Sequence, residues 1–425
     1  MEKKTRRIIF FIFVFIFLLS APLVVLYFQG YRFDFENKKL TQTGGIFLKA
    51  VPRQAEIYID GGFSRKTDFF FGSILIEELL PKKYNIKVKK EGYFEWEKNL
   101  EVKEKEVVEA KEIILFPKDA DFSLLSNGIK NLWFSPDGKR MVWEEKEGNL
   151  WTLKLYDLNK NLKSHLLKES DVSKKGAEFF DLEFSKDGKE IYFKVITAEQ
   201  LKSFALEIDK IPPVLKETKE SSLLPENIIT YEEFNNDIYY LDNLGYLYKT
   251  DASFSLKEKV TTASFPLKKE TGYELYVFPD FIFLEEGGEI LYLLNQETKI
   301  FERFFEGINS LKISSDSKKL VYCSDSEIRV LFLKEKTTRP TRKMGESIFL
   351  VRLSEKIKDV FWLMSRYLIF NTENKIKIAE IDNRDRINII DLAEFENSEI
   401  FWNPVDKKLY VLEGENLWAS KNLIP

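Results

Sequence analysis

Short runs of alternating apolar and polar residues occupy most of this chain, and one arrangement of them recurs. Residues 133–143 read WFSPDGKRMVW, an apolar run, a Ser-Pro-Asp-Gly turn and a second apolar run. Proline presets φ, aspartate caps its own backbone and glycine accepts the left-handed conformation, so the pattern predicts a β-hairpin. The pattern returns at 184–193 (FSKDGKEIYF) and, in weaker form, at 313–322 and 402–411.

The spacing of these hairpins predicts a repeat protein. Repeat units lie near Trp133, Glu183, Lys312, Phe361 and Phe401. Neighbouring units are 40 to 50 residues apart, and the one longer gap, from Glu183 to Lys312, has room for two more. Segments 226–251 and 273–295 fill it, because each reads as three short strands without the Ser-Pro-Asp-Gly turn.

Seven units of about four strands each predict a seven-bladed β-propeller over residues 119–425. A blade that is apolar on both faces cannot fold alone, and radial packing lets neighbouring blades cover each other. The last unit shows three strands, so residues 120–126 are expected to supply its outer strand and to close the ring. Tryptophans in predicted strands are expected to pack between blades, with a carbohydrate-stacking platform as the alternative: Trp133, Trp143, Trp151, Trp362, Trp402 and Trp418.

The amino-terminal segment has a different pattern. Residues 8–28 contain no charged residue, and 21 apolar-rich residues suffice to cross a bilayer as a helix. Lys3, Lys4, Arg6 and Arg7 precede this segment within residues 1–7, so the positive-inside rule predicts a cytoplasmic stub and a single-pass anchor. A cleaved signal peptide is the alternative, but its apolar region would be shorter and followed by a small-residue cleavage site.

A polar connection, residues 29–43, leads to a predicted β-sandwich at residues 44–117. Its strands alternate, as in AEIYIDG (residues 55–61) and YNIKVKKEGY (residues 84–93).

Residues 44–117 resemble the PEGA domain family in several places: Pro52 with Ala55, the EIYIDG strand and turn, Lys66-Thr67, LPKKY at 80–84 and EGY at 91–93. The family usually has glycine before the alanine, where this chain has Gln54, and it usually has a glycine within the PKKY stretch. The resemblance implies an envelope-exposed binding module. Asp60 and Thr67 are expected to form turns rather than to bind a ligand.

The hairpin turns at Ser135–Lys139 and Ser185–Lys189 resemble those of WD40-like, TolB-like propellers of the bacterial envelope. This resemblance covers about residues 120–425 and implies a fold. It names no function, because propellers host binding, scaffolding and many chemistries.

The composition argues against several kinds of functional site. The formal net charge is −4 with both signs interspersed, which gives no basic face for nucleic acid. There is one histidine, His165, in a predicted outer strand and expected at the surface, and one cysteine, Cys323, expected to be buried. These two cannot form a zinc site or a Ser-His-Asp triad. Asp137 and Asp187 are expected to shape turns, since single carboxylates on separate blades lack the oxygens that Ca²⁺ needs.

The sequence therefore predicts an all-β protein consisting of a transmembrane helix, a PEGA-like sandwich and a propeller. We expect a non-enzymatic binding or scaffolding protein of the bacterial cell envelope, with its bulk outside the cytoplasm and no cofactor, metal or catalytic residue. Its expected partner is an envelope protein or a cell-wall or surface polysaccharide, recognised by propeller loops. The main alternative is a polysaccharide lyase or glycosidase with two facing channel carboxylates. A membrane-coupled sensor is a third possibility, but a seven-residue stub is too short to signal alone.

Overall fold

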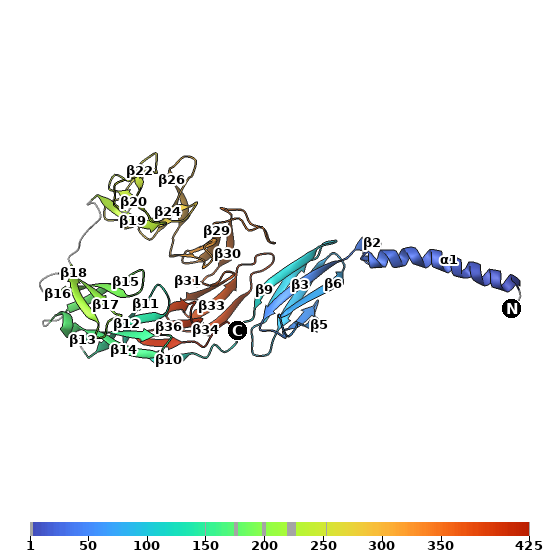
Figure 1. The fold of residues 1–425 in the computed structure, drawn as a ribbon, viewed down its shortest axis with the longest axis horizontal. Coiled ribbons are helices and arrows are strands. Elements are labelled where there is room, and N and C mark those ends of the chain that lie inside the picture. Colours follow the sequence, from blue (N-terminus) through green and yellow to red (C-terminus); the bar gives the residue numbers. More distant parts are fainter. Residues whose placement is uncertain are drawn as a thin grey trace. The chain divides into compact units, whose positions relative to one another are not determined.

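The structure is a computed structural model that describes residues 3–148, 150–173, 177–197, 201–218, 227–251 and 253–424 (Figure 1). Residues 1 and 2 of the predicted stub, residue 226 of one predicted repeat and residue 425 lie outside the described residues. The chain divides into two compact units. The first unit comprises residues 1–119, 382–388 and 424–425, and the second comprises residues 120–381 and 389–423.

The first unit begins with helix α1 (Lys3–Phe28), which includes the predicted span 8–28. Within Thr5–Phe28, the most apolar stretch of 18 residues has a mean hydropathy of 3.1 and no buried residue, so the helix is long and apolar enough to cross a membrane. The predicted connection 29–43 contains a β-hairpin of strands β1 (Tyr31–Asp34) and β2 (Lys39–Gln42).

Two further sheets of the first unit share one apolar core. The strand order is β6-β3-β9 in one sheet and β5-β4-β7-β8 in the other. The bounds are β3 (Gly44–Val51), β4 (Glu56–Ile59), β5 (Gly62–Lys66), β6 (Ser73–Leu79), β7 (Lys83–Lys89), β8 (Trp96–Glu101) and β9 (Val107–Ile114). Ile46 and Leu48 of β3 join Ile57 of β4 and Ile86 of β7 in this core, as strand alternation requires.

The backbone explains one departure from the PEGA pattern. Gln54 has φ of +59°, in the left-handed region where glycine is favoured. The Gln54 side-chain amide donates to the Thr67 carbonyl at 3.2 Å, which helps to hold this conformation. A glycine at this position in the family therefore reflects the backbone conformation that the turn requires.

Within the described residues, the second unit contains seven four-stranded antiparallel sheets, numbered here by chain order. The first sheet is β11 (Ile129–Phe134), β12 (Arg140–Glu147), β13 (Leu150–Asp157) and β14 (Leu162–Lys168). The second is β15 (Ala177–Phe184), β16 (Glu190–Thr197), β17 (Leu201–Glu207) and β18 (Val214–Thr218). The third is β19 (Ile228–Phe234), β20 (Asp237–Asp242), β21 (Leu247–Asp251) and β22 (Lys257–Lys259). The fourth is β23 (Tyr273–Val277), β24 (Ile282–Glu286), β25 (Ile290–Leu294) and β26 (Phe301–Glu306).

The fifth sheet is β27 (Ser310–Ile313), β28 (Lys319–Cys323), β29 (Glu327–Phe332) and β30 (Ser347–Arg352). The sixth is β31 (Ile357–Met364), β32 (Tyr367–Thr372), β33 (Lys375–Glu380) and β34 (Ile389–Glu394). The seventh is β35 (Glu399–Asn403), β36 (Lys408–Glu413) and β37 (Asn416–Ala419), with β10 (Ser123–Ser126) as its outer strand. One short helix, α2 (Glu169–Val172), follows the first sheet and was not expected from the sequence.

The outer strand of the seventh sheet comes from the start of the second unit. Strand β10 pairs antiparallel with β37, and Ser123 is opposite Ala419 and Leu124 opposite Trp418. Residues 123–126, which come before the first sheet in the chain, thus form the fourth strand of the seventh sheet. This pairing joins residues almost 300 positions apart and covers an edge that would otherwise offer unpaired backbone groups.

Buried apolar clusters join four pairs of sheets among the described residues. Trp143 and Met141 of the first sheet pack with Tyr410 and Leu417 of the seventh. Other clusters join the first sheet to the second, the third to the fourth and the fourth to the fifth. Trp143 and Trp151 are buried in such clusters, which is the packing role expected for tryptophans in the repeats.

Candidate functional site

The recurring turn is built around its aspartate. In the first sheet, the Asp137 carboxylate accepts hydrogen bonds from the Ser135 hydroxyl at 2.7 Å and from the Lys139 backbone N–H at 3.0 Å. These bonds hold the pKa of Asp137 below its ordinary value, with the Ser135 bond contributing most. Asp187 and Asp316 accept equivalent bonds from serine hydroxyls in the second and fifth sheets.

The same turns contact neighbouring sheets. The Asn403 side-chain amide of the seventh sheet donates to the Gly138 carbonyl at 2.8 Å. The Arg140 guanidinium of the first sheet donates to the Gly188 carbonyl of the second at 3.3 Å. At Gly138 and Gly188, the turn therefore shapes a hairpin and also presents a carbonyl group that a side chain of another sheet binds.

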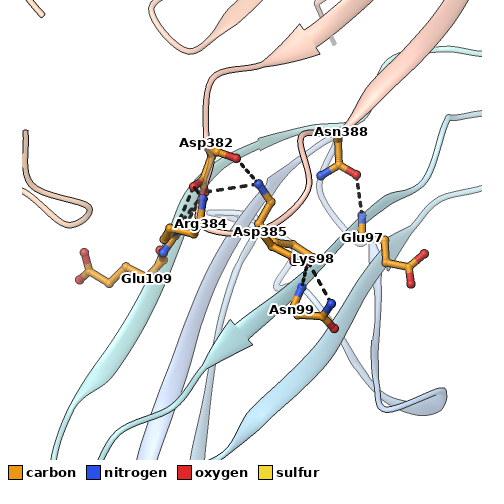
Figure 2. Close-up of polar contacts among 8 residues, drawn as sticks. All are labelled: Glu97, Lys98, Asn99, Glu109, Asp382, Arg384, Asp385 and Asn388. Atoms are coloured by element: carbon orange, nitrogen blue, oxygen red, sulfur yellow. Dashed lines mark hydrogen bonds and ion pairs between the residues drawn. The ribbon is translucent and has the colours of Figure 1, made fainter. Parts of the chain in front are cut away.

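A polar cluster in the first unit surrounds a buried lysine (Figure 2). The loop Asp382–Asn388, which connects β33 to β34, belongs to this unit by its contacts. Lys98 of β8 has a fully buried side chain, and its ammonium group donates to the Asp382 carbonyl and lies 3.9 Å from the Asp382 carboxylate. The Arg384 guanidinium contacts that carboxylate at 2.6 Å and donates to the Glu109 carbonyl at 2.8 Å.

The rest of the loop follows the backbone of β8. The Asp385 carboxylate accepts the Asn99 backbone N–H at 2.9 Å and the Asn99 amide at 3.0 Å (Figure 2). The Asn388 side-chain carbonyl accepts the Glu97 backbone N–H at 3.3 Å. Loop side chains thus accept hydrogen bonds from the Glu97 and Asn99 backbone N–H groups, as the carbonyl groups of a neighbouring strand would.

Electrostatics keep Asp382 charged. Burial alone would raise the pKa of this carboxyl, but the hydrogen bonds from Arg384 and the charge of Lys98 outweigh it and lower the pKa. The pKa of Asp385 is also lowered, chiefly by the Asn99 backbone hydrogen bond. Both carboxylates therefore strengthen their contacts at neutral pH and lose them in acid.

The second unit contains a surface cleft of about 480 Å³ between the fourth and fifth sheets. Strand β26 lines one side and strands β28 and β29 line the other, with these residues: Arg303, Phe304, Phe305, Glu306, Tyr322, Glu327 and Arg329. Its size is in the range of small-molecule and peptide sites, and it combines aromatic faces with charged groups.

Charge pairing fixes the side chains of this cleft. Glu327 accepts from Arg329 at 2.8 Å and also from Arg352, and Arg303 pairs with Glu306 at 2.7 Å. Burial would raise the pKa of Glu327, but the two arginines outweigh it and lower that pKa. The cleft therefore carries both charges at neutral pH and can offer arginine donors to carboxylate or phosphate oxygens.

The fourth sheet holds a close pair of carboxylates. Glu274 of β23 and Glu285 of β24 are direct cross-strand partners, and the Tyr276 hydroxyl lies 2.7 Å from one and 3.0 Å from the other. Burial first, and the charge of Glu274 to a lesser degree, raise the pKa of Glu285. The tyrosine hydroxyl lies against both carboxylates, so this pair is arranged around a side chain of the protein itself.

The residues singled out in the sequence occupy separate places. His165 is exposed on β14, and Cys323 is buried on β28, where burial raises the pKa of its thiol to about 12. Asp60 accepts the Asn85 backbone N–H at 2.9 Å beside its turn, and the buried Thr67 hydroxyl accepts the Ala55 N–H at 3.0 Å. Asp60 and Thr67 thus make structural hydrogen bonds, while Cys323 is buried and His165 is exposed.

Within the part of the chain that the structure describes, no group of three or more His, Cys, Asp or Glu side chains is placed to hold a metal ion. Sequence reasoning also did not find the Lys98 and Arg384 cluster. Lysine at position 98 looks like one of many charges in an alternating strand, and only the long-range contact with the loop reveals its burial.

The apolar helix α1, three small sheets in the first unit and seven four-stranded sheets in the second together define, within the described residues, a β protein of two units with an apolar amino-terminal helix. Residues 43–113 match the PEGA domain family, which confirms the resemblance predicted from the sequence. Among curated proteins, none matches this chain.

The solved structures that resemble this chain include a β-propeller domain, and the three described here are 8–13% identical to it. The Swd1 β-propeller domain from Myceliophteria thermophila is 13% identical with a TM-score of 0.41, over 70% of this chain and 99% of that one. YCF48 from Cyanidioschyzon merolae is 10% identical with a TM-score of 0.44, over 71% and 98%. A chain of a mitotic checkpoint complex is 8% identical with a TM-score of 0.41, over 70% and 92%.

Proposed function

We propose that this chain is a membrane-anchored binding and scaffolding protein of the bacterial cell envelope. Helix α1 is the anchor in this proposal, and the four basic residues before position 8 keep its amino terminus in the cytoplasm. Both β units then lie outside the cytoplasm. The observation that carries the proposal is that no residue of the apolar segment Thr5–Phe28 is buried, because a soluble protein rarely exposes so large an apolar surface to water.

In this proposal the first unit is a β-sandwich, and the seven sheets of the second unit are the blades of a closed propeller. The pairing of β10 with β37 supports closure, as does the cluster shared by the first and seventh sheets. A closed ring suits a scaffold, because its rigid sheets hold recognition surfaces at fixed positions.

The cleft between the fourth and fifth sheets is the proposed recognition site. Its partner is an envelope protein or a surface polysaccharide that presents carboxylate or phosphate groups to Arg329 and Arg303 and an apolar face to Phe304. Recognition by paired arginines and aromatic rings requires no catalytic group.

The alternative of a carbohydrate-active enzyme needs two carboxylates on opposite sides of a substrate. Glu274 and Glu285 are neighbours on one sheet, and the Tyr276 hydroxyl lies within hydrogen-bond distance of both carboxylates. We therefore favour binding over hydrolysis or elimination.

Two experiments test the proposal. Cysteines introduced as Glu2→Cys and His165→Cys report topology when intact spheroplasts are treated with a membrane-impermeant maleimide, because the native Cys323 is buried. We expect labelling at position 165 and none at position 2. Labelling at position 2, or none at 165, would overturn the proposed orientation.

Recognition is tested with the full-length protein in detergent micelles, by capture from envelope extract and by a glycan array. We expect Arg329→Ala to lose the captured partner or glycan, and the matched control Arg65→Ala, an exposed arginine of the first unit, to retain it. Turnover of a glycan by the wild-type chain would replace binding with the enzymatic alternative.

A further inference from the structure

The hairpin β1–β2 has its polar and apolar residues on the opposite sides from those expected of a soluble protein. Phe33 and Leu40 are cross-strand partners, and both are about half exposed. Phe35, at the turn, is 82% exposed and lies edge-to-face against Phe33 at 5.0 Å. Meanwhile Asp34 and Thr41 are buried.

The polar side of the hairpin is fully engaged within the first unit. The Asp34 carboxylate accepts the Glu36 and Asn37 backbone N–H groups at 3.0 and 3.1 Å, which forms the turn. These bonds, with the Asn37 amide bond contributing most, lower the pKa of Asp34. On the same side, Arg32 pairs with Glu78 of β6 at 2.7 Å. The hairpin is therefore held in one orientation, and its apolar side is left outward.

The end of the apolar helix lies against the hairpin. Helix α1 ends at Phe28, three residues before the hairpin begins. The Arg32 guanidinium lies 3.6 Å from the centre of the Tyr27 ring and donates to the Tyr27 carbonyl at 2.9 Å, so the hairpin contacts the helix end.

The length of the helix places its end at the membrane surface. The 24 residues of Thr5–Phe28 extend about 36 Å, slightly more than the roughly 30 Å thickness of a hydrocarbon core. Tyr27 and Phe28 then lie at the headgroup level, where aromatic residues are enriched. The hairpin that contacts Tyr27 lies at the same level.

We propose that hairpin β1–β2 is a membrane-interface contact, in which Phe33, Phe35 and Leu40 insert among lipid headgroups. This inference rests on the proposed function, because it requires α1 to be the anchor. Lipid covers the three apolar side chains, and the exposed Lys38 and Lys39 beside them attract anionic headgroups. The hairpin thereby holds the first unit against the bilayer instead of leaving it on a flexible tether.

Spin labels on the full-length protein test this placement. Phe35→Cys and Leu40→Cys are labelled one at a time, with Ile16→Cys in α1 and Phe63→Cys on β5 as references. Both reference side chains are more than half exposed, and the native cysteine is buried. The labelled proteins are reconstituted into phosphatidylcholine–phosphatidylglycerol vesicles, and collision rates with oxygen and with a water-soluble nickel complex are measured.

We expect the oxygen-to-nickel ratio at positions 35 and 40 to lie clearly above that at 63 and below that at 16. Two substituted positions guard against a local effect of losing Phe35. A high ratio at 16 with water-like ratios at 35 and 40 would overturn the hairpin inference and leave the anchor intact. A water-like ratio at 16 would overturn both. Spin–spin broadening between labels at position 35 would assign the face to a second copy of the chain and so contradict the inference.

Discussion

Removing the charge of Asp382 is expected to destabilise the first unit more than removing the charge of Lys98. Asp382→Asn leaves the fully buried Lys98 and the largely buried Arg384 without the carboxylate that faces both. Lys98→Met fills a similar volume and leaves Asp382 paired with Arg384. The two variants thus remove the same ion pair, one by replacing the carboxylate and the other by replacing the ammonium group, and only the first leaves a buried charge without its carboxylate partner.

The magnitudes follow from burial. Removing the carboxylate partner of a buried charge costs about 3–5 kcal/mol. Losing one hydrogen bond to a charged group, with the remaining charge still paired, costs about 1.5–3 kcal/mol. The exposed pair of Lys111 and Glu109, at 2.7 Å, should contribute at most about 1 kcal/mol. Lys111→Met is therefore the matched control.

Native-state hydrogen exchange measures these effects locally. The Glu97 and Asn99 backbone N–H groups donate to loop side chains, so exchange in peptides that cover residues 96–101 reports release of the loop. We expect exchange there to accelerate more than about 100-fold in Asp382→Asn, since each 1.4 kcal/mol is a factor of ten. Lys98→Met should accelerate it less, and Lys111→Met hardly at all.

The pH dependence of the same exchange provides an independent check. The pKa of Asp382 is lowered in the folded protein. Its contribution to the stability of the folded state is therefore present above the ordinary pKa of about 4 and is lost as the pH falls through the pKa of the folded protein.

Equal exchange in Asp382→Asn and Lys98→Met, or wild-type exchange in both, would refute the assignment of this cluster as a buried ion pair that holds the loop.

Two further predictions concern the second unit. Gly138→Ala should lower the melting temperature more than Gly188→Ala. Both glycines have positive φ, but only at Gly138 would a Cβ lie 2.8 Å from Asn403 and Val405. Equal losses of melting temperature would argue against the contact between the turns. Glu285→Gln should stabilise the protein relative to wild type by about 0.5–1 kcal/mol at pH 7 and by less at pH 5. The raised pKa of Glu285 means that its charged form destabilises the folded protein. This destabilisation is present above the pKa in the folded protein and is relieved as the carboxyl is protonated. Thermal unfolding of both variants at the two pH values measures this, and a stabilisation that grows in acid would contradict it.

Much of the fold could be predicted because its signals are local. Proline, aspartate and glycine in the turn around Asp137 specify a hairpin by their own conformational preferences, and strand alternation repeats with each unit. Even the pairing of 120–126 with the last sheet follows from counting strands. The degraded third and fourth units were found by spacing, and each contributes a fourth strand that its sequence did not announce.

Features that depend on long-range contacts could not be predicted. The hairpin within residues 29–43 reads as a polar connection, because the burial of Asp34 and Thr41 depends on the rest of the first unit. The loop Asp382–Asn388 lies between two strands of the sixth sheet in sequence, and nothing local assigns it to the first unit. The cleft between β26 and β29 likewise arises only when two sheets pack together.

The claim that the repeated sheets close on themselves is tested most directly by a disulfide across the β10–β37 pair. Ser123 and Ala419 are opposite each other in the register, so Ser123→Cys with Ala419→Cys brings two thiols to neighbouring strands, while the native cysteine stays buried. We predict that the full-length double variant forms this bond under mild oxidation and unfolds at a higher temperature than its reduced form, because the cross-link closes a loop of almost 300 residues. Two accessible thiols that remain unlinked under the same conditions would contradict closure.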